Sequence, residues 1–310
     1  MGNDRQQRHE HTTLPQGRDI PLLLLGILGI GSSGPFIAKS SMPIPSLIFW
    51  RNFLGALSMA PFAIRKAEWR SELGRRNIKL SILAGVILAG HFLAFFGAMR
   101  FTSVATGTAL TSLQPIFAAL YMKYRGAVIS RQSMIGIFIA FLSLLLITGV
   151  DLHLSTRAFI GDLYGILAGA LAAGYVIMGS TVSRTLATST YLTFCFGSCA
   201  LVSIIVSLSG GINLFHFAHQ QWFLAVGLFI GAQFFGHTLF NMTLKRVSPV
   251  MVSLIVFFEV PVSAIIAWFW LHQHPSSGTL PGIVGLLIGC AIFVLRNKPS
   301  EPTSAPVIEG

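Results

Sequence analysis

The segment SILAGVILAGHFLAFFGAM, residues 81–99, contains no Lys, Arg, Asp or Glu. A helix needs about 20 apolar residues to cross a hydrocarbon core of about 30 Å, and a helix satisfies its own backbone hydrogen bonds in lipid. The whole chain is 310 residues long, 53% hydrophobic and only 10% charged. This composition lies outside the range of soluble globular domains. The segment therefore predicts a transmembrane helix in an all-α polytopic membrane protein.

Working outward from this segment, apolar runs of similar length recur along the chain. We predict ten transmembrane helices, at residues 20–39, 46–64, 78–99, 102–122, 132–150, 160–182, 190–209, 222–244, 249–270 and 280–296. The stretch before residue 20 is polar and does not have the pattern of a cleaved signal peptide.

The basic residues of the chain follow the connections between these runs. Although the formal net charge is +11, most Lys and Arg residues fall in the tails and in alternate loops. This distribution follows the positive-inside rule if both termini are cytoplasmic. We therefore predict a multi-pass protein of the cell (inner) membrane whose partner is the lipid bilayer, and no nucleic-acid partner.

The chain also contains an internal repeat. His91 aligns with His237 and Pro115 with Pro261, in both cases 146 residues apart and without a gap. Each half would hold five helices, so equivalent helices would cross the membrane in opposite directions. The sequence therefore predicts two inverted five-helix repeats, with a binding site between them near the midplane. The expected organisation is a cytoplasmic tail at 1–19, repeats at 20–150 and 158–296, and a second cytoplasmic tail at 297–310.

Several short motifs resemble the drug/metabolite transporter superfamily, and specifically its EamA-type permeases. They are Gly34-Pro-Phe-Ile-Ala-Lys39, Phe49-Trp-Arg51, Leu113-Gln-Pro115, Gly161-Asp162 and Glu259-Val-Pro261. The resemblance spans roughly residues 20 to 296. It implies two five-helix repeats and a secondary transporter that moves small solutes by alternating access.

Glu259 is interpreted as the only carboxylate deep within an apolar run. An ionisable group at that depth costs about 3 kcal/mol or more, which makes Glu259 the first functional candidate. It could exchange a proton near physiological pH or neutralise an amine on the substrate. A structural pairing of Glu259 with a histidine or an arginine is a third interpretation.

Other polar residues are candidates for a substrate or coupling-ion site. Gln233, His237 and Asn241 recur every four residues and so share one helix face. Further candidates come from other helices, namely His91, Thr111, Gln114 and Tyr175. The alternative for all of them is hydrogen bonding between helices without any substrate contact.

Three residues are predicted to have mechanical or interfacial roles. Pro115 and Pro261 lie inside apolar runs, where proline frees a carbonyl one turn earlier and kinks the helix. Arg51 is expected to extend its side chain to the membrane interface, with anion binding as the alternative.

The leading hypothesis is a secondary transporter for a small metabolite or drug-like solute, acting as an exporter. An integral-membrane enzyme acting on lipid or peptide is the alternative, but such enzymes need paired acids, a metal cluster or an activated nucleophile. A non-transporting membrane sensor is a third class. We predict no enzymatic activity, no cofactor and no metal site, and the substrate, the coupling ion and the oligomeric state stay open.

Overall fold

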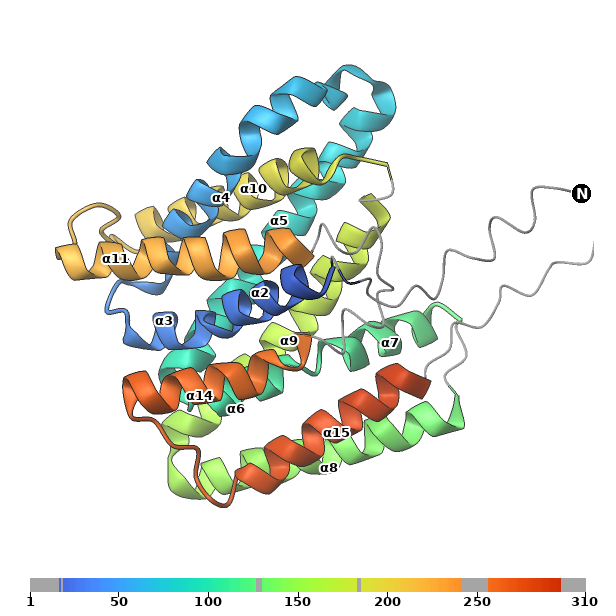
Figure 1. The fold of residues 1–310 in the computed structure, drawn as a ribbon, viewed down its shortest axis with the longest axis vertical. Helices are drawn as coiled ribbons and strands as arrows, with labels where there is room; N and C mark the ends of the chain where they lie inside the picture. The colour runs from blue at the N-terminus through green and yellow to red at the C-terminus, as the bar shows by residue number, and fades with distance from the viewer. Residues whose placement is uncertain (1–16, 18, 127–129, 183–184, 241–255, 297–310) are drawn as a thin grey trace, which may run out of the picture.

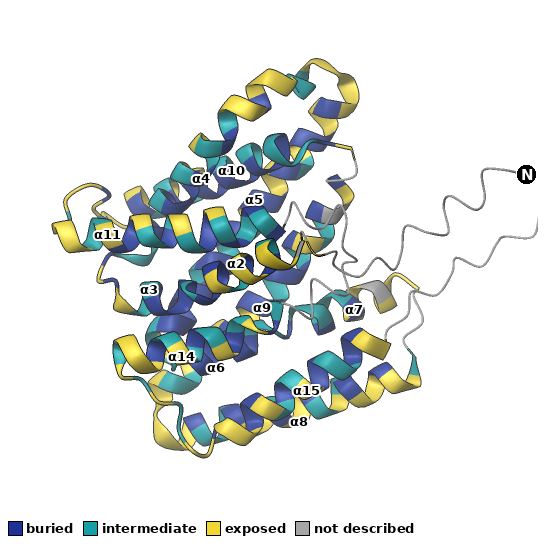
Figure 2. Ribbon diagram, viewed as in Figure 1, coloured by how far each residue is buried: buried dark blue, intermediate teal, exposed yellow. Residues whose placement is uncertain are grey.

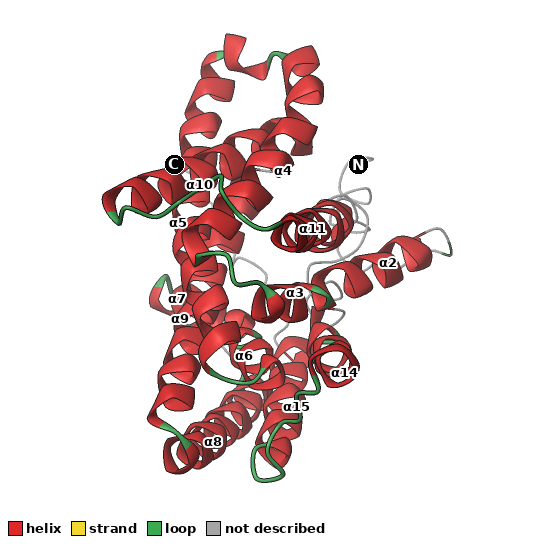
Figure 3. Ribbon diagram, turned by 90° about the vertical axis from the view of Figure 1, so that its left-hand side faces the viewer, coloured by secondary structure: helices red, strands yellow, loops and turns green. Residues whose placement is uncertain are grey.

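The computed structural model describes residues 17, 19–126, 130–182, 185–240 and 256–296. Figure 1 shows these residues as a bundle of helices, and Figure 3 shows the same bundle turned by 90°, with loops between the helices and no strand among the residues drawn. The helices are α2 (Asp19–Gly31), α3 (Ser33–Lys39), α4 (Ile44–Lys66), η1 (Glu68–Arg70), α5 (Glu72–Phe101), α6 (Val104–Thr111), α7 (Gln114–Tyr124), α8 (Arg131–Leu154), α9 (Thr156–Val182), α10 (Thr188–Ser209), α11 (His219–Leu228), η2 (Phe229–Thr238), α14 (Glu259–Leu271) and α15 (Leu280–Arg296).

The all-α fold class predicted from the sequence is confirmed. Within the described residues, six helices are long and apolar enough to cross a membrane, and α14 and α15 are shorter apolar helices. Three of the expected helices are divided, into α2 with α3, α6 with α7, and α11 with η2. The expected helix at 249–270 is described only from residue 256 onward.

The helix contacts repeat between the two halves of the chain. In the first half, α5 packs against α9 and α10. In the second half, η2 packs against α2 and α4, which are the helices that correspond to α9 and α10 in the repeat alignment. Three further contacts join helices that correspond to each other, namely α4 with α10, α6 with α14, and α8 with α15. The repeat found in the sequence is therefore also visible in the packing.

Glycines set the closest helix contacts. A Cβ atom added to Gly29 of α2 would lie only 2.5 Å from the carbonyl oxygen of Gly231 in η2. A Cβ atom on Gly136 of α8 would lie 2.6 Å from the carbonyl oxygen of Gly289 in α15. Without a side chain, the two backbones can approach closely, as is common between membrane helices.

Two of the interruptions occupy matching places in the two halves. A turn at residues 112–113 separates α6 from α7, shortly before Pro115. A turn at residues 257–258 precedes α14, and Pro261 is the third residue of that helix. The two turns coincide to within one residue in the repeat alignment. Interrupted helices of this kind supply backbone groups to binding sites in secondary transporters.

Hydrogen bonds tie the loops together at each end of the bundle. At one end, which we name the Arg100 face, Arg100 donates to the carbonyl oxygens of Ser40, at 3.0 Å, and of Met42. This face also carries the loops at residues 102–103, 210–218 and 272–279. At the other end, which we name the Glu68 face, the Glu68 carboxylate accepts from the backbone N–H of Ala187 at 3.0 Å.

The outward sides of the helices are apolar. Figure 2 shows exposed residues along α8 and α15, and they include Phe138, Leu142 and Ile288. Large apolar side chains exposed over several turns match a lipid environment, because hydrocarbon does not penalise them.

Candidate functional site: a buried arginine among aromatic rings

Arg51 is buried inside the bundle. It belongs to α4, and only 1% of its surface is exposed. The interfacial position predicted from the sequence is wrong, because the side chain turns inward toward α5 and η2. Its guanidinium carbon lies 4.2 Å from the ring centre of Phe92 and 5.9 Å from that of Phe96. The electron-rich faces of these rings attract a cation, which offsets part of the cost of burying it.

An amide pair provides the polar contacts of Arg51. Its Nε donates to Oε1 of Gln233 at 2.7 Å, and Nε2 of Gln233 donates to Oδ1 of Asn52 at 3.4 Å. Gly55, one turn along α4, makes room for Gln233, since a Cβ atom there would lie 3.1 Å from its Cγ and Nε2 atoms. The Nη1 group of Arg51 is buried and has no hydrogen-bond partner among the residues that the structure describes. The guanidinium of Arg51 therefore lacks at least one hydrogen-bond acceptor.

The two histidines aligned by the repeat both lie near Arg51. His91 is buried, and both His91 and His237 lie within the electrostatic range of the guanidinium. Nδ1 of His91 is 2.9 Å from the carbonyl oxygen of Ala168. Because a carbonyl oxygen only accepts, Nδ1 carries the hydrogen in this contact. The ring of His237 meets Phe92 edge to face at 6.1 Å.

Glu259 lies within the electrostatic range of Arg51. It is the first residue of α14, it is half-buried, and it also interacts with the Ser33 hydroxyl. The position is set by close packing of α14 on α2. The Ser263 hydroxyl donates to the carbonyl oxygen of Gly31 at 2.6 Å, and a Cβ atom on Gly31 would collide with Val262. The N-terminus of a helix also favours a nearby negative charge.

The other predicted site residues are distributed as follows. Tyr175 of α9 is buried and lies within the electrostatic range of Arg51. Thr111 lies at the end of α6, where its hydroxyl donates to the carbonyl oxygen of Gly107 at 2.9 Å and approaches that of Gly165 at 3.5 Å. Gln114 begins α7, and its backbone faces α9. Asn241 lies outside the described residues.

The structure thus gathers Gln233, His237, His91, Tyr175 and Glu259 around Arg51. It places Thr111 and Gln114 at the α6–α7 turn, on the side of α9. Arg51 itself was not among the favoured site residues, although the motif Phe49-Trp-Arg51 contained it. The signal that could have identified it is its depth, since it lies about six residues inside a predicted span.

A second buried charged group was also missed. Asp151 of α8 is 6% exposed, and Asp162 of α9 is 0% exposed. The interpretation of Glu259 as the only carboxylate at depth is therefore wrong. These two carboxyl groups face each other near the Arg100 face, together with Thr102.

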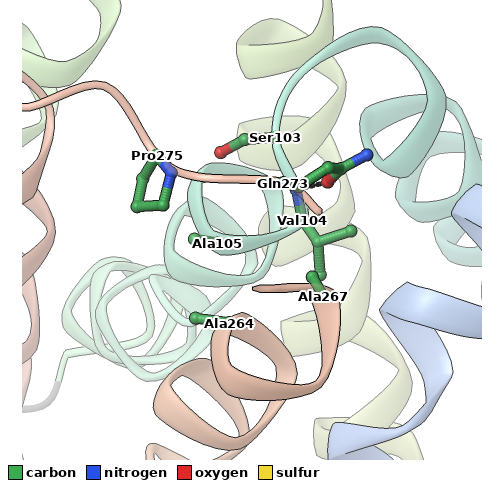
Figure 4. Close-up of a pocket in the computed structure, with 7 residues that line it drawn as sticks. All are labelled: Ser103, Val104, Ala105, Ala264, Ala267, Gln273 and Pro275. Carbon is green, nitrogen blue, oxygen red and sulfur yellow. Dashed lines mark hydrogen bonds between the residues drawn. The ribbon is translucent and has the colours of Figure 1, made fainter. Parts of the chain in front are cut away.

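A small depression lies between the start of α6 and the end of α14. Figure 4 shows its lining by Val104, Ala105, Ala264, Ala267 and neighbouring loop residues. The side-chain oxygen of Gln273 in this region is 3.4 Å from the backbone nitrogen of Val104. The depression is lined mainly by small apolar groups and has no charged side chain, so it is a poor site for a polar solute.

Comparison with known proteins shows which group the chain resembles. It is 22% identical over 296 residues to the uncharacterized transporter YxxF of Bacillus subtilis (strain 168), and the match covers 91% of both chains. It is 25% identical over 262 residues to an uncharacterized transporter of Archaeoglobus fulgidus, covering 83% of this chain and 89% of that protein. One solved protein structure superposes with a TM-score of 0.63 at 14% identity, covering 92% of this chain and 99% of the other, which shows a shared fold.

The family model of the EamA-like transporter family matches the chain twice, at residues 18–149 and 159–295. These two matches cover most of the chain and correspond to its repeated halves. The chain is a multi-pass membrane protein, and it belongs to the EamA-like transporter family.

Proposed function

We propose that this transporter moves a small solute that carries a negatively charged group, by alternating access and without a cofactor. The observation that carries the proposal is the buried guanidinium of Arg51, whose Nη1 group finds no hydrogen-bond partner within the described part of the chain. An unsatisfied buried donor costs about 1–3 kcal/mol, and more when it is charged. A carboxylate or phosphate on a solute would supply the missing acceptor.

The surroundings of Arg51 favour a solute with an apolar part beside its charge. Phe92 and Phe96 provide ring faces, while Gln233 and Asn52 orient the guanidinium. Arginine presents its donors in a planar fork that matches carboxylate and phosphate oxygens. A buried guanidinium therefore favours solutes that carry a negative charge and whose oxygens match its planar set of donors.

Glu259 is proposed as the residue that carries the coupling proton. Its carboxylate lies in the field of Arg51. An anionic solute bound to Arg51 would remove that favourable field and place a second negative charge nearby. Glu259 would then take up a proton, because like charges at close range disfavour each other's ionised form. Solute binding and protonation are linked in this scheme.

The Glu68 face is proposed to be cytoplasmic, and net transport is proposed to be outward. Basic residues gather at this end of the described helices, namely Arg65, Lys66, Arg70, Arg75, Arg76, Lys123, Arg125, Arg131 and Arg296. The positive-inside rule supports this orientation. The outward direction rests on the resemblance to metabolite and drug exporters.

Reporter fusions test the orientation. A reporter after Arg70 and one after Lys298 should both read cytoplasmic, while one near Gly211 should read external. An external signal after Arg70 would overturn the orientation and the inverted arrangement of the halves.

A flux assay on reconstituted vesicles tests the solute class. The panel pairs small carboxylates and phosphates with neutral analogues of the same shape, with and without a pH gradient. We expect uptake of at least one charged member and none of its neutral analogue. Transport of neutral members at equal rates would overturn the assignment to Arg51.

Substitutions at Arg51 test in the same flux assay whether this residue binds the solute. Removing one partner of a buried, hydrogen-bonded charge pair costs about 2–5 kcal/mol, so Arg51→Gln should weaken solute binding on the order of 100-fold or more. Arg51→Lys keeps the charge without the fork and should show a smaller loss. Arg65→Gln makes the same chemical change at the exposed end of α4 and should leave flux unchanged.

A further inference from the structure

Two carboxyl groups are buried side by side at the end of the bundle nearest the Arg100 face. Asp151 lies in the last turn of α8 and Asp162 lies in α9. The Thr102 hydroxyl donates to Oδ2 of Asp151 at 3.2 Å. Asp162 is fully buried, and among the described residues neither of its carboxyl oxygens has a partner in standard hydrogen-bond geometry. Its interacting neighbours are Asp151 and Thr102.

A glycine places Asp162 in this position. Gly161 precedes it, and a Cβ atom there would lie 2.5 Å from the backbone nitrogen of Thr102 and 2.8 Å from the carbonyl carbon of Phe101. Any other residue would push α9 away from the turn between α5 and α6. The close contact is therefore built into the chain, and it holds Asp162 against Asp151 and Thr102.

The basic residues on the neighbouring helices do not pair with the two carboxyl groups among the described residues. Arg100 of α5 donates to the carbonyl oxygens of Ser40 and Met42. Arg157 of α9 donates to the carbonyl oxygen of Arg100 at 3.0 Å and lies over the ring of Phe101 at 5.2 Å. His153 of α8 is exposed. The described residues of α6 contain no titratable group, and those of α7 lie at its far end.

Two ionised carboxylates cannot be kept together in such a place without a compensating charge. Burying a single unpaired charge costs several kcal/mol, and a second charge of the same sign at contact distance adds repulsion. A metal ion would need more oxygen ligands than the three side chains here provide. One proton shared between the two carboxyl groups removes a charge and also supplies the donor that Asp162 lacks.

We propose that Asp151 and Asp162 together form a binding site for one proton, separate from the solute site. The pair lies on α8 and α9, whereas Arg51 and Glu259 lie on α4 and α14. With the proton bound, α8, α9 and the α5–α6 turn can pack closely and keep the Arg100 face shut. Loss of the proton would leave two charges in contact and would drive these elements apart.

Infrared spectroscopy of the full-length protein tests this site directly, because a protonated carboxyl group has a C=O stretch that a carboxylate lacks. The chain has ten acidic residues. Besides Asp151, Asp162 and Glu259, the structure describes Asp19, Glu68 and Glu72, and each of these three begins a helix at the end of the bundle opposite the Arg100 face. The measurement is made at neutral pH in a Glu259→Gln background, so that only the pair can give the signal from a buried carboxyl group.

We expect one protonated carboxyl band in that background. Asp151→Asn and Asp162→Asn should each remove it, because an amide partner lets the remaining carboxyl group ionise. Asp162→Glu keeps a carboxyl group at this position and should retain the band. Glu68→Gln should leave the band unchanged. Two asparagine variants are included so that a failure of one to fold still leaves the test open.

Three results would overturn the proposal. They are the absence of the band in the Glu259→Gln background, its survival in both asparagine variants, and its loss when sodium is added at constant pH. The last result would assign the pair to a metal cation. None of these readouts depends on transport, so the outcome is independent of the proposed solute.

Discussion

Arg51 and the Asp151–Asp162 pair are both buried charged groups, but they are compensated in different ways. The cation of Arg51 has an amide oxygen, two aromatic faces and a carboxylate within range. The two acids have one hydroxyl donor between them and no cation in hydrogen-bond contact among the described residues. Arg51 is therefore compensated from several sides and lacks an acceptor at Nη1, whereas the two acids have hardly any compensation.

The difference follows from what a membrane helix bundle can offer. Aromatic rings and amide oxygens are electron-rich, and this chain has 25 phenylalanines, so a cation finds partial compensation on many sides. An anion needs hydrogen-bond donors, and the backbone N–H groups of a helix are already used. A buried acid in such a bundle therefore depends on a proton or on a dedicated donor.

The largest expected effect comes from Glu259→Gln. The amide keeps nearly the same shape and removes both the charge and the proton, so the variant should insert at near-normal levels and lose gradient-driven flux by tenfold or more. Any pH dependence of solute binding should be lost with it. Flux into reconstituted vesicles and binding over a pH series measure both quantities.

Glu68→Gln provides the matched control for Glu259→Gln, since Glu68 begins the short helix η1 at the end of the bundle and its carboxylate accepts a hydrogen bond from the backbone of Ala187. It should transport normally. Full and equally pH-dependent flux in well-folded Glu259→Gln protein would reduce Glu259 to a structural residue.

An intermediate effect is expected from Gln233→Leu. This change removes the acceptor of Nε of Arg51 and leaves a second donor of the guanidinium unsatisfied. A hydrogen bond to a charged group contributes about 1.5–3 kcal/mol, so the variant should unfold at a clearly lower temperature. Thermal unfolding in detergent with lipid measures the shift. Asn52→Leu is the comparison, and its effect should be smaller because both contacts that it loses are neutral, one of 3.4 Å from Gln233 and one of 2.9 Å to the carbonyl oxygen of Ile48 in the same helix. Equal shifts would mean that the charge of Arg51 is compensated mainly by the rings.

The smallest effect is expected from Thr102→Val, which removes the single hydroxyl donor to Asp151 while keeping the side-chain shape. The loss should be about 1 kcal/mol, because the shared proton still compensates the pair. Thr108→Val is the matched control, since that hydroxyl donates only to carbonyl oxygens of its own helix. A collapse of stability in Thr102→Val would show that the hydroxyl, and not a proton, supports the two acids.

The sequence predicted the helical fold because long apolar runs have few alternatives in lipid. It also indicated that His91 and His237 would occupy related places, and both lie near Arg51. The direction of Arg51 was predicted wrongly because sequence position gives depth along a helix but not the neighbours on each side. Only the packing of α4 against α5 and η2 determines that.

The acidic pair was missed for a different reason. The predicted span ended at residue 150, which left Asp151 in a loop, whereas α8 continues to Leu154. Helix ends are uncertain by a few residues, and here one residue separates a loop acid from a buried one. Asp162 was inside the predicted span at 160–182 but near its start, so it was not weighed as a buried acid. The π-helical winding of η2 could not be foreseen either. It is visible in the contact from the Thr238 hydroxyl to the carbonyl oxygen of Gln233, five residues earlier, and has no clear signature in composition.

The burial of Arg51 has a consequence for biogenesis. The helix that carries it has a mean hydropathy of 1.4, the lowest of the six long spans, and an arginine at the centre of a helix costs about 2.5–3.5 kcal/mol during insertion. Its hydrogen-bond partner Gln233 is synthesised 182 residues later. Until Gln233 has been made, the charge of Arg51 has partners only from the first half of the chain, such as the rings of Phe92 and Phe96 in α5. We expect the packing around Arg51 to be completed only after the second half of the chain has been inserted.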